Sequence, residues 1–145
     1  MSNALRRSCA LIGALFLVLG LITLLGIIMR AHLTGEVSGL FVLYTALNFL
    51  MAYGFFERHY WVYPALVATL ILNILLWGLR IAGGTLTQTD WLVAMLVLIL
   101  NLALIAITHR NYRRLARTRQ AQYVGVCFLV LWALMACYTI LIKLV

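Results

Sequence analysis

The chain has 145 residues, of which 66% are hydrophobic and 10% are charged, and its formal net charge is +8. A soluble domain of this length needs a polar surface that such a composition cannot supply, so the composition excludes a soluble globular protein and indicates an integral membrane protein. The length leaves no room for a separate soluble module, and we expect one domain over residues 1–145.

Five uncharged apolar stretches predict an all-α, polytopic fold with five transmembrane helices in one compact bundle. At a rise of about 1.5 Å per residue, stretches of 18 to 21 residues cover the roughly 30 Å hydrocarbon core. Helices also satisfy every backbone polar group internally, as lipid requires. The expected spans are Cys9–Met29, Gly39–Phe56, Trp61–Leu79, Trp91–Thr108 and Tyr123–Ile142.

The first stretch resembles a secretory signal because Arg6 and Arg7 precede it. Its 21 residues exceed the roughly 7–15 of a signal-peptide apolar region, so we expect it to be retained as the first span. Gly13 and Gly20 lie seven residues apart on nearly one face, where small residues let another helix approach closely. The pattern favours a contact within the bundle over a docking face for a partner, and leaves both open.

Local signals mark the ends of the next three helices. Ser38 and Asp90 are the predicted N-caps of the second and fourth helices, and Pro64 falls in the first turn of the third. The turn at residues 57–60 is so short that we expect the second and third helices to form an antiparallel hairpin.

The basic residues are distributed unevenly between the two sides of the membrane, which predicts the orientation. With the N-terminus inside, eight lie on the cytoplasmic side and three on the other. We therefore expect the N-terminus in the cytoplasm and the C-terminus on the opposite side. A bacterial inner (plasma) membrane is the favoured location, and an organelle membrane is left open. The eight are Arg6, Arg7, Arg58, Arg110, Arg113, Arg114, Arg117 and Arg119, and the three are Arg30, Arg80 and Lys143.

Three spans carry an asparagine near the membrane midplane, and these amides predict a polar cluster. The cluster consists of Asn48, Thr69, Asn73 and Asn101. An amide in hydrocarbon needs a partner, so these side chains should face protein. The sequence favours interhelical hydrogen bonds that only stabilise the bundle. It leaves open a site for a lipid headgroup, a quinone or a translocated solute.

The connection before the last span contains arginines at i, i+3, i+4 and i+7, which place them on one face of a helix. They are Arg110, Arg113, Arg114 and Arg117. A short interfacial helix in contact with anionic lipid headgroups would explain the spacing, although setting the topology is sufficient and is the favoured explanation. Nucleic-acid binding is not expected, because the connection is short and offers only Tyr112 for base stacking.

Two cysteines and two histidines fall near the cytoplasmic boundary: Cys9, His59, His109 and Cys127. Such side chains are zinc ligands, and paired histidines can ligate haem. No Cys-x-x-Cys spacing brings them together, so this is a remote alternative, and we expect neither a metal nor a cofactor.

The sequence lacks the residues that membrane enzymes and proton-coupled transporters commonly use. No span contains a charged residue, and no serine lies in a nucleophile motif. The sequence favours a non-catalytic accessory or structural subunit of a larger membrane assembly. An oligomeric transporter or flippase for a lipid-like or neutral solute is the alternative, and an enzyme using the cysteines and histidines ranks third. The expected partners are the bilayer with its anionic headgroups and either a membrane protein or further copies of the chain.

Overall fold

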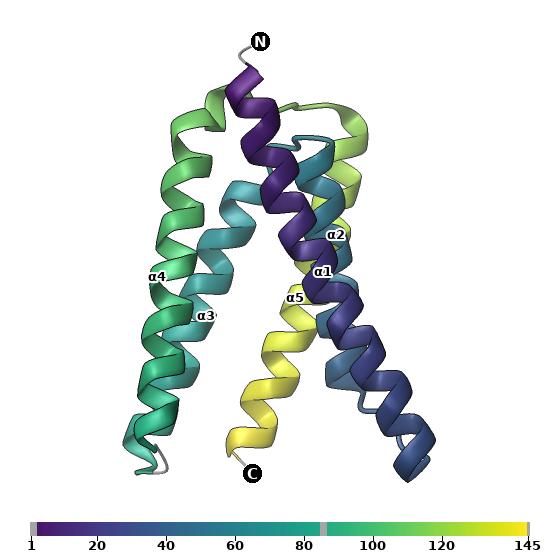
Figure 1. The fold of residues 1–145 in the computed structure, drawn as a ribbon, viewed down its shortest axis with the longest axis vertical. Helices are drawn as coiled ribbons and strands as arrows, with labels where there is room; N and C mark the ends of the chain where they lie inside the picture. The colour runs from purple at the N-terminus through teal and green to yellow at the C-terminus, as the bar shows by residue number, and fades with distance from the viewer. Residues whose placement is uncertain (1–2, 85–86, 145) are drawn as a thin grey trace. The chain divides into compact units, whose positions relative to one another are not determined.

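A computed structural model describes residues 3–84 and 87–144, and this part of the chain is all-α with no strand. The predicted fold class, with five helices of membrane-spanning length, is confirmed (Figure 1). The elements are α1 (Asn3–Thr34), α2 (Gly39–Phe56), α3 (Val62–Ala82), α4 (Gln88–Asn111), the 3₁₀ helix η1 (Tyr112–Arg114) and α5 (Arg119–Leu144).

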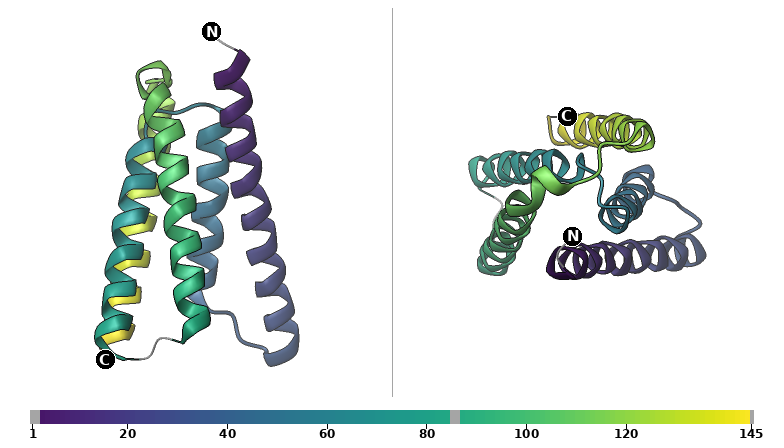
Figure 2. Two further views of the ribbon diagram at one scale, coloured as in Figure 1. Left: turned by 60° about the vertical axis from the view of Figure 1, so that its left-hand side comes forward. Right: turned by 90° about the horizontal axis from the view of Figure 1, so that it is seen from above.

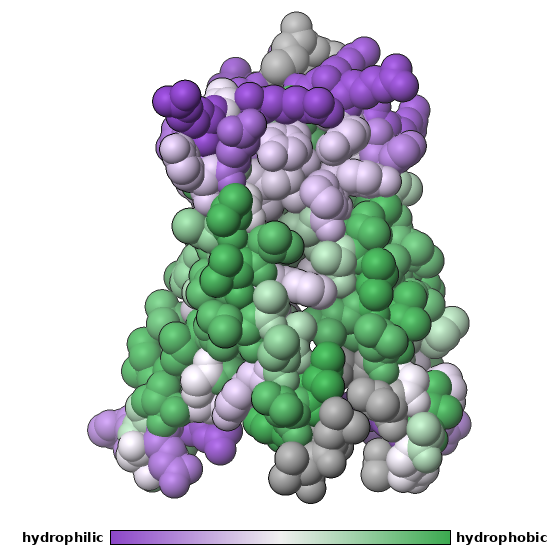
Figure 3. All heavy atoms as spheres, turned by 180° about the vertical axis from the view of Figure 1, so that it is seen from behind, coloured by the Kyte–Doolittle hydropathy of each residue, from purple (hydrophilic) through white to green (hydrophobic). Residues whose placement is uncertain are grey.

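All five α-helices are long and apolar enough to cross a membrane, so the chain is an integral membrane protein. Figure 3 shows apolar side chains over the bodies of the helices and hydrophilic side chains gathered where helices end. α2 has the predicted bounds, whereas α1 begins six residues before Cys9 and continues to Thr34. Hydropathy marks only the hydrocarbon-crossing part of a helix, and helical hydrogen bonding continues into the polar interface.

The helix starts agree only partly with the predicted caps. Ser38 is the N-cap of α2, although its side chain makes no capping hydrogen bond with a described residue, and Pro64 lies in the first turn of α3. The prediction of Asp90 as N-cap is wrong, because Thr87 holds that position. The Thr87 hydroxyl accepts from the Asp90 backbone N–H at 3.3 Å, and the Asp90 carboxylate accepts from the Thr87 backbone N–H at 2.9 Å. This reciprocal capping box satisfies two backbone donors at once, which a single cap does not.

The chain divides into two compact units, which are described separately. The first unit comprises Met1–Val62 and Leu115–Val145, with α1, α2 and α5, and the second comprises Tyr63–Arg114, with most of α3 and with α4. Two of the sequence-based predictions concern the arrangement of the two units. They are the single bundle over residues 1–145 and the hairpin of the second and third helices. They therefore stay predictions.

In the first unit α1 packs along α2, and α5 packs against α2 (Figure 2). The glycines of α1 make the close approach possible. A Cβ atom on Gly13 would lie 3.2 Å from the Ala52 carbonyl oxygen, and one on Gly20 would lie 3.0 Å from the Phe49 ring. The prediction that these glycines serve a contact within the fold is confirmed.

Several buried aromatic side chains of the first unit lie where α2 ends. Phe55 is fully buried, and its ring stacks on Phe16 with 5.8 Å between centroids. The Trp61 ring lies 5.1 Å from the Phe128 ring of α5, and the His59 backbone N–H donates to the Gly54 carbonyl at 2.8 Å. The chain therefore leaves α2 through a tight, aromatic-packed turn.

Candidate functional site

The second unit is a pair of antiparallel helices, α3 and α4, that side-chain contacts hold together at both ends. At the first end the Tyr63 hydroxyl and His109 Nδ1 are hydrogen-bonded at 3.0 Å, and the Tyr63 and Tyr112 rings lie 4.9 Å apart. At the other end an Arg80 guanidinium nitrogen lies 3.8 Å from an Asp90 carboxylate oxygen. These contacts hold the two helices together at both ends of the pair.

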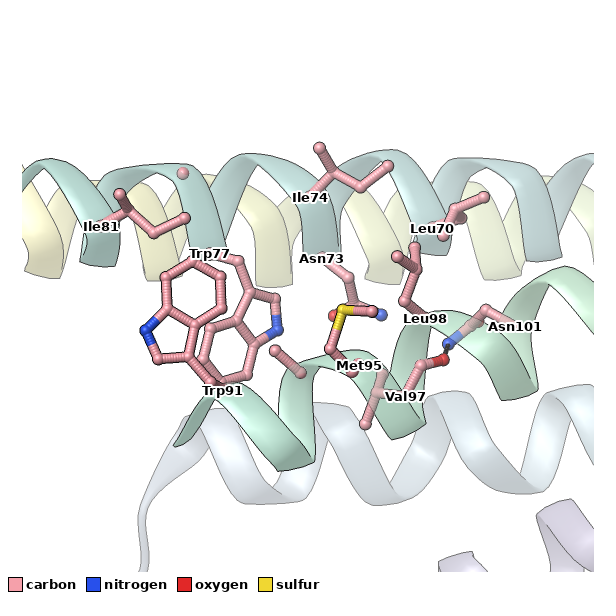
Figure 4. Close-up of a pocket in the computed structure, with 12 residues that line it drawn as sticks. Leu70, Asn73, Ile74, Trp77, Ile81, Trp91, Met95, Val97, Leu98 and Asn101 are labelled. Carbon is pink, nitrogen blue, oxygen red and sulfur yellow. Dashed lines mark hydrogen bonds between the residues drawn. The ribbon is translucent and has the colours of Figure 1, made fainter. Parts of the chain in front are cut away.

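Between these ties lies a cavity of about 280 Å³ (Figure 4). Its lining is apolar except for two carboxamides and two indole N–H groups, and none of the described lining residues is charged. The lining residues are Leu70, Asn73, Ile74, Trp77, Gly78, Ile81, Trp91, Ala94, Met95, Val97, Leu98 and Asn101. We call this space the α3–α4 cavity.

The two carboxamides of the α3–α4 cavity differ in their hydrogen bonding. Asn101 Nδ2 donates to the Val97 carbonyl of its own helix at 2.8 Å. The Asn73 carboxamide, which is partly buried and extends from α3 toward α4, makes no hydrogen bond with a described residue (Figure 4). Asn73 therefore presents both an amide donor and an amide acceptor to the cavity.

Aromatic side chains from both helices lie at the end of the α3–α4 cavity near the Arg80–Asp90 contact. Trp77 comes from α3 and Trp91 from α4, and the Arg80 guanidinium carbon lies 5.3 Å from the Trp77 ring centroid (Figure 4). Asn73 lies one helical turn from Trp77, about 6 Å along the axis. The cavity thus combines an aromatic end with a hydrogen-bonding amide further along.

The predicted polar cluster is only partly assembled. Asn73 and Asn101 share the α3–α4 cavity, whereas the Thr69 hydroxyl donates to the Ala65 carbonyl of its own helix at 2.8 Å and does not line the cavity. Asn48 belongs to the first unit, where it is buried and its Nδ2 donates to the Tyr44 carbonyl at 3.0 Å. Its membership of the cluster stays a prediction.

A side-chain hydrogen bond between α1 and α2 comes from threonines and not from Asn48. Thr45 of α2 donates to the Thr23 hydroxyl of α1 at 2.9 Å. Thr23 in turn is within hydrogen-bonding distance of the Leu19 and Gly20 carbonyls of its own helix, at 3.1 and 3.0 Å. Hydroxyls can make such a bond while also bonding to their own helix, so they hold α1 to α2 without leaving a polar group unpaired.

The alternative of one interfacial helix through the arginines is wrong. α4 carries Arg110 and ends at Asn111, η1 holds Arg113 and Arg114, and Arg117 lies in the non-helical segment before α5. The four side chains are exposed, but they do not lie on one face of a single helix. Their contact with anionic lipid headgroups stays a prediction.

Backbone hydrogen bonds between Ala116 and the turn at residues 57–60 explain why that helix does not form. The Ala116 N–H donates to the Arg58 carbonyl at 2.7 Å, and the Tyr60 N–H donates to the Ala116 carbonyl at 3.1 Å. The Arg117 guanidinium carbon lies 5.8 Å from the Tyr60 ring centroid. Because Ala116 uses both of its backbone groups in this pairing, the segment cannot also continue a helix.

His59 is a buried structural residue of the same turn. Its side chain is 4% exposed, and the Trp61 indole N–H donates to His59 Nδ1 at 3.2 Å. An indole nitrogen can only donate, so Nδ1 must accept and the imidazole is neutral. Burial lowers the pKa of His59 from its ordinary value of 6.5, and the nearby Glu57 carboxylate opposes this shift less strongly.

We expect acidification to destabilise the protein through His59. The unfolded chain has the ordinary pKa and binds a proton first, so the stabilisation is complete above about pH 6.5 and is lost as the pH falls through the lowered folded-state pKa. Melting temperatures measured in detergent from about pH 7 down to pH 5 should fall for the wild type and change much less for His59→Gln. Parallel curves for both proteins would contradict this role of His59.

The metal alternative gains no support from the geometry. Among the described residues, no three His, Cys, Asp or Glu side chains gather closely enough to hold a metal ion. Cys9 and His59 are buried in the first unit and Cys127 is exposed on α5, while His109 bonds to Tyr63 in the second. Because three of the four residues belong to the first unit and His109 belongs to the second, a site formed by all four stays a hypothesis.

Sequence reasoning missed the α4 contribution of Trp91 and Met95 to the cavity. It named Trp91 only as the first residue of the fourth expected span, and it did not consider Met95 at all. The spacing of Trp91, Met95 and Leu98 at i, i+4 and i+7 puts all three on one face of α4. The α3 pair Asn73 and Trp77 has the same four-residue spacing, and this correspondence was the available signal.

Comparison of the chain with protein-family models, curated proteins and solved structures gives no significant match. Its function must therefore be inferred from the geometry of the chain itself.

Proposed function

We propose that this protein is a non-catalytic accessory or structural subunit of a larger membrane assembly. We place it in a bacterial inner membrane with its N-terminus in the cytoplasm, as the distribution of basic residues predicts. The observation that carries the role is an exposed apolar seam on α1.

Residues Leu11, Val18, Ile22, Leu25 and Met29 form this α1 seam, and they are between 51% and 72% exposed. Their spacing of seven, four, three and four residues is the 3.5-residue repeat by which one helix packs along another. The seam lies on the side of α1 roughly opposite Gly13 and Gly20, which face α2. The occupant that fits it is an apolar transmembrane helix of a different protein.

The length of α1 supports the same role. Its 32 residues extend about 48 Å, well beyond the roughly 30 Å of hydrocarbon. A helix that continues past the membrane core offers a partner helix a contact along its whole crossing. Thr23, Thr45 and Asn48 of the α1–α2 pair are already hydrogen-bonded within the chain, and the α1 seam itself is apolar, so the contact would be one of apolar packing.

Native mass spectrometry of the protein, gently extracted from its own membrane, tests the proposal. We expect one further protein at fixed stoichiometry, and we expect the combined change Val18→Ala, Ile22→Ala and Leu25→Ala to release it. The matched control is Leu17→Ala, Leu21→Ala and Ile28→Ala, which truncates exposed residues on the flank of the same helix and should keep the partner. A partner retained equally by both triple variants, or no partner at all, would overturn the α1 seam as the interface.

The second candidate is an oligomeric transporter or flippase for a lipid-like or neutral solute. It is favoured by the α3–α4 cavity, in which Asn73 and Asn101 lie together within the membrane-spanning part of the chain. In the same mass spectra, a homo-oligomer carrying bound lipid and no other protein would favour this candidate over the first.

A further inference from the structure

We propose that the α3–α4 cavity binds a neutral, membrane-dissolved amphiphile whose flat ring carries a carbonyl or hydroxyl oxygen, the chemistry of quinones and phenols. The proposal concerns binding alone, so it goes beyond the accessory role and does not depend on it. It would also supply the ligand class of the transport alternative, which requires such binding.

The size of the α3–α4 cavity limits the ligand. Its volume of about 280 Å³ is nearly twice that of an engineered apolar cavity of about 150 Å³ that holds benzene. The lining extends along α3 from Leu70 to Ile81, which is about 17 Å of helix. A substituted ring and the start of an apolar tail fit this elongated space, and the rest of a long tail would lie among lipid chains.

The absence of charge from the lining of the α3–α4 cavity favours a neutral ligand. None of the described lining residues is charged, and Arg80 and Asp90, which lie beyond one end, contact each other. An anionic headgroup or a cation inside the cavity would lose its hydration without gaining a charged partner. The same argument excludes the phosphate group of a phospholipid as a ligand of the cavity.

Asn73 supplies the polar recognition. Its carboxamide lines the cavity and makes no hydrogen bond with a described residue, in contrast to Asn101, which bonds to Val97. A partly buried amide in an apolar setting is stabilised by a partner that completes its hydrogen bonds. Its N–H₂ can donate to a ring carbonyl, and its oxygen can accept from a ring hydroxyl, so both oxidation states of a quinone satisfy it.

The aromatic end distinguishes a ring from a simple acyl chain. Trp77 and Trp91 reach the cavity from facing helices, and Met95 lies beside Asn73 (Figure 4). Indole faces pack favourably against flat rings, and thioether sulfur makes favourable contacts with aromatic edges. An acyl chain would gain apolar contact here but no stacking and no hydrogen bond to Asn73.

Glycines provide a matched pair of variants for the test. Gly78 lines the cavity, Gly26 belongs to α1 and is not among the lining residues, and a Cβ atom on either would meet no atom within 4 Å. Gly78→Leu should therefore fill the cavity without disturbing the fold, and Gly26→Leu adds the same side chain elsewhere. Asn73→Leu and Asn48→Leu form a second pair, one inside the cavity and one outside.

The experiment is a titration of the purified full chain in nanodiscs with decylubiquinone, read by quenching of tryptophan fluorescence and corrected for partitioning with empty nanodiscs. We expect saturable binding by the wild type, Gly26→Leu and Asn48→Leu. Gly78→Leu should weaken binding at least tenfold, and Asn73→Leu by about tenfold, the effect of losing one hydrogen bond of about 1.4 kcal/mol. Melting temperatures within a few degrees of wild type identify the variants that remain folded.

Three outcomes would overturn the proposal. The first is no saturable binding by the wild type, and the second is equal affinity of Gly78→Leu and Gly26→Leu. The third is displacement of the quinone by dodecanol at the same concentration as by a second quinone, because a simple chain would then suffice. Each outcome leaves the test of the α1 seam unchanged, so the failures of the two proposals can be told apart.

Discussion

Trp61→Ala should lower the free energy of unfolding by about 3–5 kcal/mol, the usual effect of removing a large buried aromatic side chain. The Trp61 side chain is 5% exposed and packs against the Phe128 ring of α5. It also covers Gly125, where an added Cβ atom would lie 3.0 Å from the indole. Its loss would leave a cavity between the end of α2 and the start of α5, and His59 Nδ1 would lose its donor.

Denaturation in mild detergent, followed by the melting temperature, checks this prediction. Trp91→Ala is the matched control, because Trp91 is 49% exposed and its truncation removes much less buried contact. Trp61→Phe separates packing from hydrogen bonding. It should retain most of the stability and lose about 0.5–1.5 kcal/mol with the indole N–H. Equal losses for Trp61→Ala and Trp91→Ala would mean that the turn at residues 57–61 does not anchor the first unit.

The helices could be predicted because the membrane makes hydropathy and length nearly sufficient. Each apolar stretch long enough to cross the hydrocarbon became a helix, and α2 has the predicted bounds. The helix ends were less accessible, since they depend on specific hydrogen bonds. Asp90 was correctly placed near the start of α4, but its backbone N–H donates to the Thr87 hydroxyl, so Thr87 is the cap and Asp90 is the third helical residue.

The candidate site shows what depth and periodicity can and cannot predict. The asparagines were expected in the membrane on faces that contact protein, and Asn73 and Asn101 do share one cavity. Hydropathy could not show that Asn48 and Asn101 would each donate to a carbonyl of their own helix. An amide that bonds four residues back no longer needs another helix, so a midplane asparagine need not mark a contact between helices.

The interfacial helix suggested by the arginine spacing is absent for a different reason. A helical spacing of Arg110, Arg113, Arg114 and Arg117 predicts a face only if the backbone is helical throughout. The backbone bonds of Ala116 with Arg58 and Tyr60 join residues far apart in sequence, and no local pattern announces them. Long-range pairing of this kind overrides a local periodicity that nothing else supports.

Gly54→Ala should destabilise the first unit by about 1–3 kcal/mol, the usual range for overpacking a filled core. A Cβ atom at Gly54 would lie 2.5 Å from the Trp61 ring and 2.7 Å from a Val62 methyl group. Val62 is fully buried and Trp61 is nearly so, which leaves neither room to move aside. The Gly54 carbonyl also accepts from the His59 N–H at 2.8 Å, so a backbone shift that relieved the overlap would break the turn.

The stability of Gly54→Ala can be compared with that of two other glycine-to-alanine variants in the same unit. Gly26→Ala has open space around the new methyl group and should raise stability by about 0.5–1 kcal/mol, because alanine is the better helix former. Gly20→Ala should fall between the two, since its methyl group would meet the Phe49 ring at 3.0 Å and that ring can tilt. Melting temperatures in the order Gly26→Ala, Gly20→Ala, Gly54→Ala, from highest to lowest, are therefore expected. A Gly54→Ala protein as stable as Gly26→Ala would show that the turn can open without loss, and the low exposure of His59 and Trp61 would then need another cause.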